Sequence, residues 1–240
     1  MPTEISRVTA DGRPGRHSDA GGLIAEQAYL ELRDRIVTLR LRPGASLRED
    51  DLMRELGIGR TPLREAVKRL SLENLVAVRP RRSTVVTGVD AADIVHITEV
   101  RAELEGQAAE LAARRMDDAA REKAEALLAE LEALGRDEDP DTLMRFDGRI
   151  HRLTWETSRN PYLIETLERY YVLSLRIWYV VLDRVPGLAG AVHDQADLVD
   201  ALLARDSRRA RAIMREHVLA FEREIMAAFS MSEDERPRGG

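Results

Sequence analysis

The N-terminal part of the chain shows a helical spacing of apolar residues. Between Ala25 and Arg40 the apolar side chains recur every three or four positions, which predicts an amphipathic helix. Residues 50–56 repeat the pattern over a shorter stretch, and Gly57 is suited to end that helix. Pro62 suits the first position of a further helix with its own apolar face. The pattern therefore predicts three helices, with a tight turn between the second and the third.

The pattern changes to short apolar runs after the third helix. Residues 75–78 and 84–87 predict two short strands, which are separated by a basic loop. Gly88 marks a boundary, and Asp90 is suited to cap the first helix beyond it. From there the helical spacing continues almost to the C-terminus without a strand signal. The predicted helices cover residues 90–114, 117–134, 140–158, 161–183, 191–205 and 207–229.

These patterns divide the chain into four parts. Residues 23–88 hold three helices and a two-stranded wing, the order of a winged helix-turn-helix. Residues 89–230 hold only helices and predict an all-α bundle. The two ends, 1–22 and 231–240, lack periodic apolar residues, and we expect both to be disordered tails. The predicted fold is therefore mainly α.

Charge is distributed unevenly between these parts. The whole chain has 37 Lys and Arg against 43 Asp and Glu, so its overall balance gives no sign of nucleic-acid binding. Residues 25–88 alone carry a net charge of +4, whereas residues 89–240 carry −10. A basic module joined to an acidic one indicates that the N-terminal module binds nucleic acid.

Composition excludes several classes of protein. With 0 cysteines the chain has neither disulfides nor thiolate zinc sites, and a cytoplasmic location is the default. No apolar run approaches the ~18 residues of a membrane helix, so we expect no membrane partner. The N-terminal residues also lack the apolar core of a secretory signal.

The third predicted helix begins with side chains suited to DNA recognition. Its first turns would present Arg60, Thr61 and Arg64 to the major groove, where base edges are within reach. The loop between the strands supplies cations for the flanking phosphates. These are Arg79, Arg81 and Arg82. The alternative is that these arginines belong to an ordinary solvated face.

Two sequence segments make this prediction specific. Residues 41–47 (LRPGASL) and 56–66 (LGIGRTPLREA) resemble the DNA-binding module of the GntR family of bacterial repressors. The resemblance implies DNA contacts from the start of the third helix and from the wing. Two positions depart from the family pattern: Gly59 stands where a Ser or Thr is usual, and Ser83 stands where a Gly is usual.

The C-terminal part carries a looser resemblance. Residues 100–112 (VRAELEGQAAELA), 159–163 (RNPYL) and 201–206 (ALLARD) resemble the FCD domain, the effector module of six to seven helices in the FadR branch of that family. The resemblance implies a small-molecule sensor, commonly for organic acids. It also implies, as in many members, a divalent metal held by one Asp and three His.

Three residues of this part have the chemistry of metal ligands. Asp147 and His151 are four positions apart, so that both leave one face of a helix, and His217 lies on the last predicted helix. Carboxylate and imidazole ligands suit zinc, nickel, iron or manganese. The family spacing leads back from His217 to Gln195, and the nearest histidine is His193. Either His193 completes the site from a frayed helix start, or Gln195 lines the pocket as a neutral hydrogen-bonding group.

Arg101 is the candidate for binding an acidic effector. Its guanidinium could hold a carboxylate by two hydrogen bonds, a use that the family resemblance favours. The alternative is a structural ion pair with Glu105, four residues further on. Seven of the ten aromatic residues lie between 146 and 179, where they could line the same pocket or form core.

Together these features predict a ligand-responsive transcriptional regulator, a homodimeric repressor that a small organic acid releases from a pseudo-palindromic operator. Two alternatives stay open at this point. One is a helical metalloenzyme with an appended DNA-binding domain, although the sequence has no nucleophile motif beside the candidate ligands. The other is a DNA-architectural protein without an effector.

Overall fold

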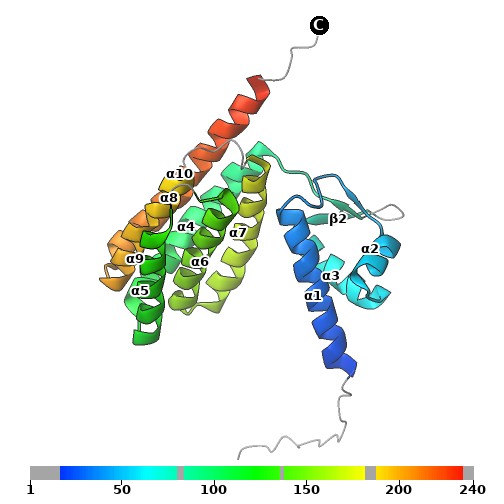
Figure 1. The fold of residues 1–240 in the computed structure, drawn as a ribbon, viewed down its shortest axis with the longest axis horizontal. Helices are drawn as coiled ribbons and strands as arrows, with labels where there is room; N and C mark the ends of the chain where they lie inside the picture. Colours follow the sequence, from blue (N-terminus) through cyan, green and yellow to red (C-terminus); the bar gives the residue numbers. More distant parts are fainter. Residues whose placement is uncertain (1–16, 80–83, 136–137, 182–187, 235–240) are drawn as a thin grey trace, which may run out of the picture. The chain divides into compact units, whose positions relative to one another are not determined.

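The computed structural model describes residues 17–79, 84–135, 138–181 and 188–234. The chain divides into two units, each with its own internal contacts (Figure 1). One unit comprises the chain up to Ile36 together with Gly44–Thr87, and the other comprises Val37–Pro43 and the chain from Gly88 onward. Gly88 is also where the apolar pattern of the sequence changes.

The first unit consists of short helices and strands in the predicted order. They are α1 (His17–Val37), β1 (Ser46–Leu47), α2 (Glu49–Leu56), α3 (Arg60–Leu72), β2 (Val76–Val78) and β3 (Thr84–Val86). The prediction of a mainly α fold with a winged helix-turn-helix is confirmed. α1 begins at His17, so residues 17–22 are helical rather than part of a disordered tail. Residues 1–16 of that predicted tail lie outside the described residues.

Gly57 makes the tight turn between α2 and α3. It ends α2 in the left-handed conformation, with φ 64°, and its N–H donates to the carbonyl oxygen of Met53. Glycine adopts this conformation without the steric cost of a Cβ atom. α3 begins at Arg60, so Pro62 lies within its first turn rather than at its first position.

The sheet has a strand that the apolar pattern did not predict. Its order is β1–β3–β2 with antiparallel pairs, so that Thr84 of β3 lies opposite Leu47 on one side and Val78 on the other. β1 has two residues, too few to show an alternation of apolar and polar positions. The two predicted strands of the wing, β2 and β3, are present and paired, and β1 adds a third strand to their sheet.

The second unit is a bundle of helices. In the described part of the chain they are α4 (Ala91–Arg115), α5 (Asp118–Ala133), α6 (Pro140–Ser158), α7 (Pro161–Val181), α8 (Leu188–His193), α9 (Gln195–Leu203) and α10 (Ser207–Asp234). α6, α7 and α10 all pack against α4 (Figure 1). Asp90 caps α4 as predicted: its carboxylate accepts the N–H of Ala92, while Asp93 accepts the N–H of Asp90.

Two helix boundaries in this unit differ from the prediction. Residues 191–205 do not form one helix, because α8 ends at His193 and α9 begins at Gln195. α10 continues to Asp234, so residues 231–234 are helical rather than part of a tail. The remainder of that predicted tail, 235–240, lies outside the described residues. Asp194, between α8 and α9, keeps right-handed helical dihedrals, and its N–H donates to the carbonyl oxygen of Gly190.

The apolar faces of these helices form the core of the bundle. Trp178 of α7 is 0% exposed, and its ring stacks on Phe221 of α10 with centroids 5.0 Å apart. Such burial removes most of the large apolar side chains from water. Among the described helices, none combines the length and the apolar character that crossing a membrane requires.

Candidate functional site

The start of α3 presents an exposed basic surface in the first unit. Leu63 and Leu70 are buried on the inner side of the helix. Arg60, Thr61 and Arg64 are exposed, with the arginine side chains 58% and 62% accessible. We call these three residues the DNA-recognition surface. Their exposure makes them accessible to a macromolecular partner.

One of the two departures from the family pattern, Gly59, lies beside this surface. Gly59 is the N-cap of α3 and forms no side-chain cap, so the helix lacks the hydroxyl acceptor that a Ser or Thr would supply. On the wing, Arg79 is exposed just after β2. Arg81, Arg82 and Ser83 lie outside the described residues.

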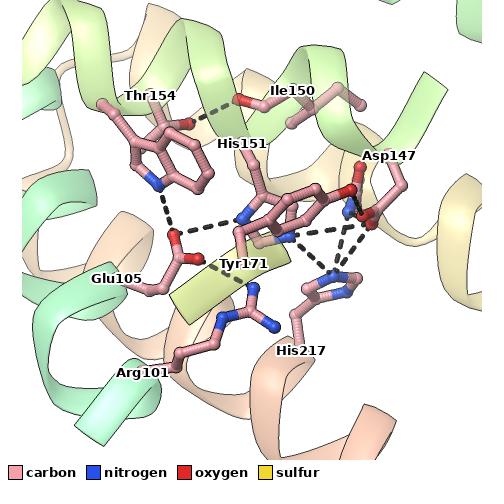
Figure 2. Close-up of polar contacts among 10 residues, drawn as sticks. Arg101, Glu105, Asp147, Ile150, His151, Thr154, Tyr171 and His217 are labelled. Atoms are coloured by element: carbon pink, nitrogen blue, oxygen red, sulfur yellow. Dashed lines mark hydrogen bonds and ion pairs between the residues drawn. The ribbon is translucent and has the colours of Figure 1, made fainter. Parts of the chain in front are cut away.

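A second candidate site is buried in the helical unit, where Asp147, His151 and His217 meet (Figure 2). We call these three residues the polar cluster. Asp147 and His151 come from α6, and His217 comes from α10. His217 Nε2 is 3.2 Å from Asp147 Oδ1 and 3.3 Å from His151 Nε2, and the last two atoms are near 3.7 Å apart. Three of the four predicted metal ligands are thus brought together.

The geometry of the polar cluster fits a metal ion. Ligand atoms about 2.1 Å from a tetrahedral ion lie about 3.4 Å from one another, close to the observed separations. The two imidazole Nε2 atoms face each other, and such a pair needs either a proton or a cation between its lone pairs. One carboxylate and two imidazoles are also donors that first-row divalent metals prefer.

Glu105 of α4 contacts His151 on the side away from His217 (Figure 2). Its fully buried carboxylate accepts hydrogen bonds from Arg101 at 2.8 Å, from Trp155 Nε1 at 2.6 Å and from His151 Nδ1 at 3.1 Å. Because a carboxylate only accepts, the Nδ1 atom of His151 carries the proton. In the neutral imidazole the Nε2 atom then directs a lone pair toward Asp147 and His217, as a metal-binding histidine must.

The charges in this region favour a positive centre. Burial by itself would raise the pKa of Glu105, but His151 and Arg101 outweigh it and lower the pKa to about 2. At Asp147, too, the effect of burial is outweighed, and His151 and His217 lower the pKa. Burial would lower the pKa of His151, but Glu105 and Asp147 raise it above its ordinary value. A proton or a metal ion can supply the charge that these shifts favour.

Tyr171 of α7 contacts two members of the polar cluster, Asp147 and His151. Its hydroxyl donates to Asp147 Oδ2 at 2.9 Å, and its ring centroid is 5.2 Å from that of His151. Gly148 permits this approach, because a Cβ atom there would lie 2.9 Å from the Tyr171 hydroxyl oxygen. Sequence reasoning placed Tyr171 and Trp155 only in an aromatic-rich stretch, and their individual roles carry no sequence signal.

Gln195, rather than His193, reaches the polar cluster. Its Nε2 atom is 2.5 Å from Asp147 Oδ1 and 3.0 Å from His217 Nε2. Its Oε1 atom is buried and has no hydrogen-bond partner among the described residues. His193 ends α8 on the other side of the helix break and is not among the residues brought together here.

Arg101 forms the ion pair with Glu105 that was the alternative to a role in effector binding. Both side chains are almost completely buried, at 4% and 0% exposed. The ion pair leaves part of the guanidinium available, because Arg101 Nε is buried without a partner in the described structure. Arg101 also lines a small cavity together with Asp147, His151 and Tyr171. The two roles of Arg101 are therefore compatible.

Two cavities adjoin the polar cluster and share His217. The inner one, beside Arg101, has a volume of about 10 Å³, which is room for about one water molecule. The outer one is a groove of about 730 Å³ between α10 and the pair α8 and α9, and Gln195 is part of its wall. Four carboxylates also line the groove: Asp194, Asp197, Glu216 and Glu224.

A winged-helix module and a helical domain with a buried polar site together define a two-domain, ligand-sensing DNA-binding protein. The sequence matches the family "Bacterial regulatory proteins, gntR family" over residues 24–86 and the "FCD domain" over residues 96–220. It is 31% identical to the HTH-type transcriptional repressor GlaR of Escherichia coli (strain K12) across 80% of this chain and 90% of that protein. The chain belongs to the GntR family and is a transcriptional regulator, not the metalloenzyme considered above.

Solved structures share the fold. McbR/YncC of E. coli has a TM-score of 0.74 and 23% identity, covering 87% of this chain and 98% of that one. A GntR transcriptional regulator from Rhodococcus sp. RHA1 has a TM-score of 0.65 and 24% identity, covering 85% of this chain and 98% of that one. At these identities the likeness concerns the fold alone.

Proposed function

We propose that this regulator is a cytoplasmic, homodimeric repressor that a small organic acid releases from a pseudo-palindromic operator. The observation that carries the proposal is the buried Arg101, which lines one cavity with the polar cluster and has an unpartnered Nε atom. A cation and a metal site around one cavity suit a carboxylate ligand. Two copies of the DNA-recognition surface, related by two-fold symmetry, suit two matching half-sites.

Each part of the DNA-binding module has a distinct role in this proposal. The DNA-recognition surface contacts base edges in the major groove, because its side chains project from the exposed start of α3. The wing arginines contact the neighbouring phosphates and supply affinity that is independent of sequence. They are Arg79, Arg81 and Arg82.

We further propose that the polar cluster holds a divalent ion: zinc, nickel, iron or manganese. Asp147, His151 and His217 supply three ligand atoms, and the Gln195 amide supports the fourth position. Rotating that amide by a half-turn exchanges its nitrogen and oxygen, which would offer Oε1 to the ion. When bound, the ion would contribute Lewis acidity and positive charge toward an anionic effector.

Two variants distinguish the candidates for the fourth ligand. Gln195→His is expected to tighten zinc binding, because imidazole is a better donor than an amide oxygen for these metals. His193→Ala is expected to leave zinc affinity unchanged, because His193 lies outside the polar cluster. Zinc titration monitored by competition with a chelating dye, together with elemental analysis of the purified proteins, measures both effects.

The opposite pattern would assign the fourth position to His193. In that case His193→Ala would lose metal and Gln195→His would gain nothing. Asp147→Ala serves as the control that removes a ligand. Wild-type protein that contains no metal, and whose melting temperature does not respond to zinc or nickel, would show that the site binds its effector without an ion.

The charge of the site explains why a metal and an acidic effector belong together. Glu105 and Asp147 are both ionised, and Arg101 balances only one of these charges. The outer groove is lined by further carboxylates. An acid would therefore be repelled unless a proton on His151 or a divalent ion adds positive charge beside His217, and a divalent ion adds more. The effector carboxylate would then enter beside His217, and the small cavity at Arg101 would have to widen for the carboxylate to reach the guanidinium.

Arg101→Lys tests the effector contact while retaining the charge beside Glu105. Lysine keeps the ion pair, but it lacks the planar fork of donors that holds a carboxylate by two hydrogen bonds. We expect the variant to bind operator like the wild type and to bind effector about tenfold more weakly or worse. Calorimetric titration with an acid that raises the wild-type melting temperature measures this. If the variant binds the effector with unchanged affinity, Arg101 has only a structural role.

The complete proposal is tested on DNA. The operator is obtained by selection from a random duplex library, and binding is followed by gel shift in the presence of a panel of carboxylic acids. An acid that both raises the melting temperature and releases the operator supports the proposal. If no acid changes either quantity, the protein binds DNA constitutively, which was the architectural alternative.

A further inference from the structure

Glu49, the first residue of α2, lies against the DNA-recognition surface. Its Oε1 atom is 3.2 Å from Arg64 Nε, and its Oε2 atom is 3.7 Å from Arg60 Nε. One carboxylate therefore contacts both arginines of the DNA-recognition surface, one oxygen to each. The neighbouring Asp50 adds a contact of 3.5 Å to Arg60 Nη2.

These ion pairs contribute little to the free energy of unfolding. The three side chains are between 41% and 62% exposed, and ion pairs of that exposure contribute little to folding because water screens them. A carboxylate in the middle of a DNA-binding surface also has a cost, since it repels the phosphate backbone. Its position therefore calls for an explanation in terms of DNA recognition.

The geometry points to such a role. Glu49 accepts a hydrogen bond from Arg64 Nε and forms a longer ion pair with Arg60 Nε, which holds the inner side of each guanidinium. A guanidinium has five N–H donors in a fixed planar fork, so Glu49 leaves the two Nη groups of Arg64 available for a bidentate contact to guanine O6 and N7, whereas at Arg60 the Nη2 group also contacts Asp50. An arginine braced in this way loses less side-chain freedom when it meets a base.

We propose that Glu49 is a specificity-determining residue, which positions Arg60 and Arg64 for base edges and disfavours their use as general phosphate ligands. The inference rests on the proposed base contacts of those arginines. A phosphate approaching the surface meets the repulsion of Glu49, whereas a guanine edge meets donors that are already oriented. Glu49 therefore raises the preference for operator over random DNA and lowers affinity for DNA in general.

The chain offers a matched control in the same turn of α2. Asp51 is also a first-turn carboxylate and is 50% exposed, but it pairs with Arg48 and Arg54 at 3.3 Å each, not with the α3 arginines. Glu49→Gln and Asp51→Asn remove the same charge from the same helix end. A third variant, Glu49→Asp, keeps the charge and withdraws the carboxylate by one methylene.

The experiment measures the ratio of affinities for selected operator and for random duplex at two salt concentrations. Glu49→Gln is expected to bind random duplex more tightly than the wild type. Its ratio of operator affinity to random-duplex affinity should be at least about fivefold lower, which is the discrimination of one good base contact. Asp51→Asn is expected to change both affinities equally and keep the ratio. Glu49→Asp is expected to lower the ratio without tightening the binding of random duplex.

The outcomes separate this inference from the proposed function. A wild-type protein that selects no sequence would overturn both. If the wild type is selective and the affinity ratio is unchanged in both Glu49→Gln and Glu49→Asp, only the role of Glu49 is overturned. A fall of the ratio in Asp51→Asn as large as in Glu49→Gln would show a general effect of charge and also overturn it. Melting curves confirm that each variant is folded, and Glu49→Asp provides the test if Glu49→Gln is not.

Discussion

Arg64→Ala is expected to abolish selective operator binding while the protein stays folded. The side chain is 62% exposed on α3, so its removal creates no cavity and exposes no buried partner. A good bidentate base contact discriminates by about 1–3 kcal/mol, and a dimer carries two copies, so about 2–6 kcal/mol of selectivity would disappear. Gel shifts with operator and random duplex measure the loss, and melting curves verify the fold.

An Arg82→Ala variant on the wing serves as the comparison. A phosphate contact carries no sequence information, so this variant should weaken binding to all duplexes alike. It should also reduce the slope of log affinity against log salt by about 1 for each phosphate that the variant no longer neutralises. Equal losses on operator and random DNA for both variants would contradict the assignment of Arg64 to a base edge.

Arg101→Ala is expected to destabilise the helical unit strongly. The substitution leaves Glu105 fully buried and ionised, with only His151 and Trp155 as donors. Removing one partner of a buried ion pair costs about 3–5 kcal/mol, because the remaining charge is no longer compensated. Urea unfolding followed by circular dichroism measures the free energy of unfolding.

Another ion pair on the same helix provides the control. Arg114 and Glu110 are also four residues apart on α4, but the arginine side chain is 59% exposed. Arg114→Ala should therefore have a much smaller effect on unfolding, since water already solvates both groups. Similar effects of the two substitutions would mean that the buried position of Arg101 adds nothing to stability. The difference also explains why Arg101→Lys is the better variant for testing effector binding.

Much of this fold can be predicted from the spacing of apolar residues. The helical stripes locate α2 and α4 to α7 closely, because an amphipathic helix carries its burial pattern in its own residues. The same logic places Arg60, Thr61 and Arg64 on an exposed helix start, since the apolar positions around them must face inward. Asp147 and His151 share a helix face for the same reason.

The spacing of apolar residues does not predict very short strands or the exact residue at which one helix ends and the next begins. β1 has only two residues and depends on β3 for its hydrogen bonds. The break between α8 and α9 falls at Asp194, next to two residues that a continuous helix would place on opposite faces. The family resemblance pointed to Gln195, but the spacing of apolar residues does not show that its side chain reaches Asp147 and His217.

The polar cluster itself depends on how the helices pack. Glu105 meets His151 and Trp155 across 46 and 50 positions of sequence, and Asp147 meets Gln195 across 48. The sequence alone supplies the candidate ligands, the basic helix start and the i to i+4 pairs, because these are local. The contacts of Glu105 with His151 and Trp155, the hydroxyl of Tyr171 over Asp147 and the contacts of Gln195 come only from the tertiary structure, because contacts between distant residues arise when separate helices bury their faces against one another.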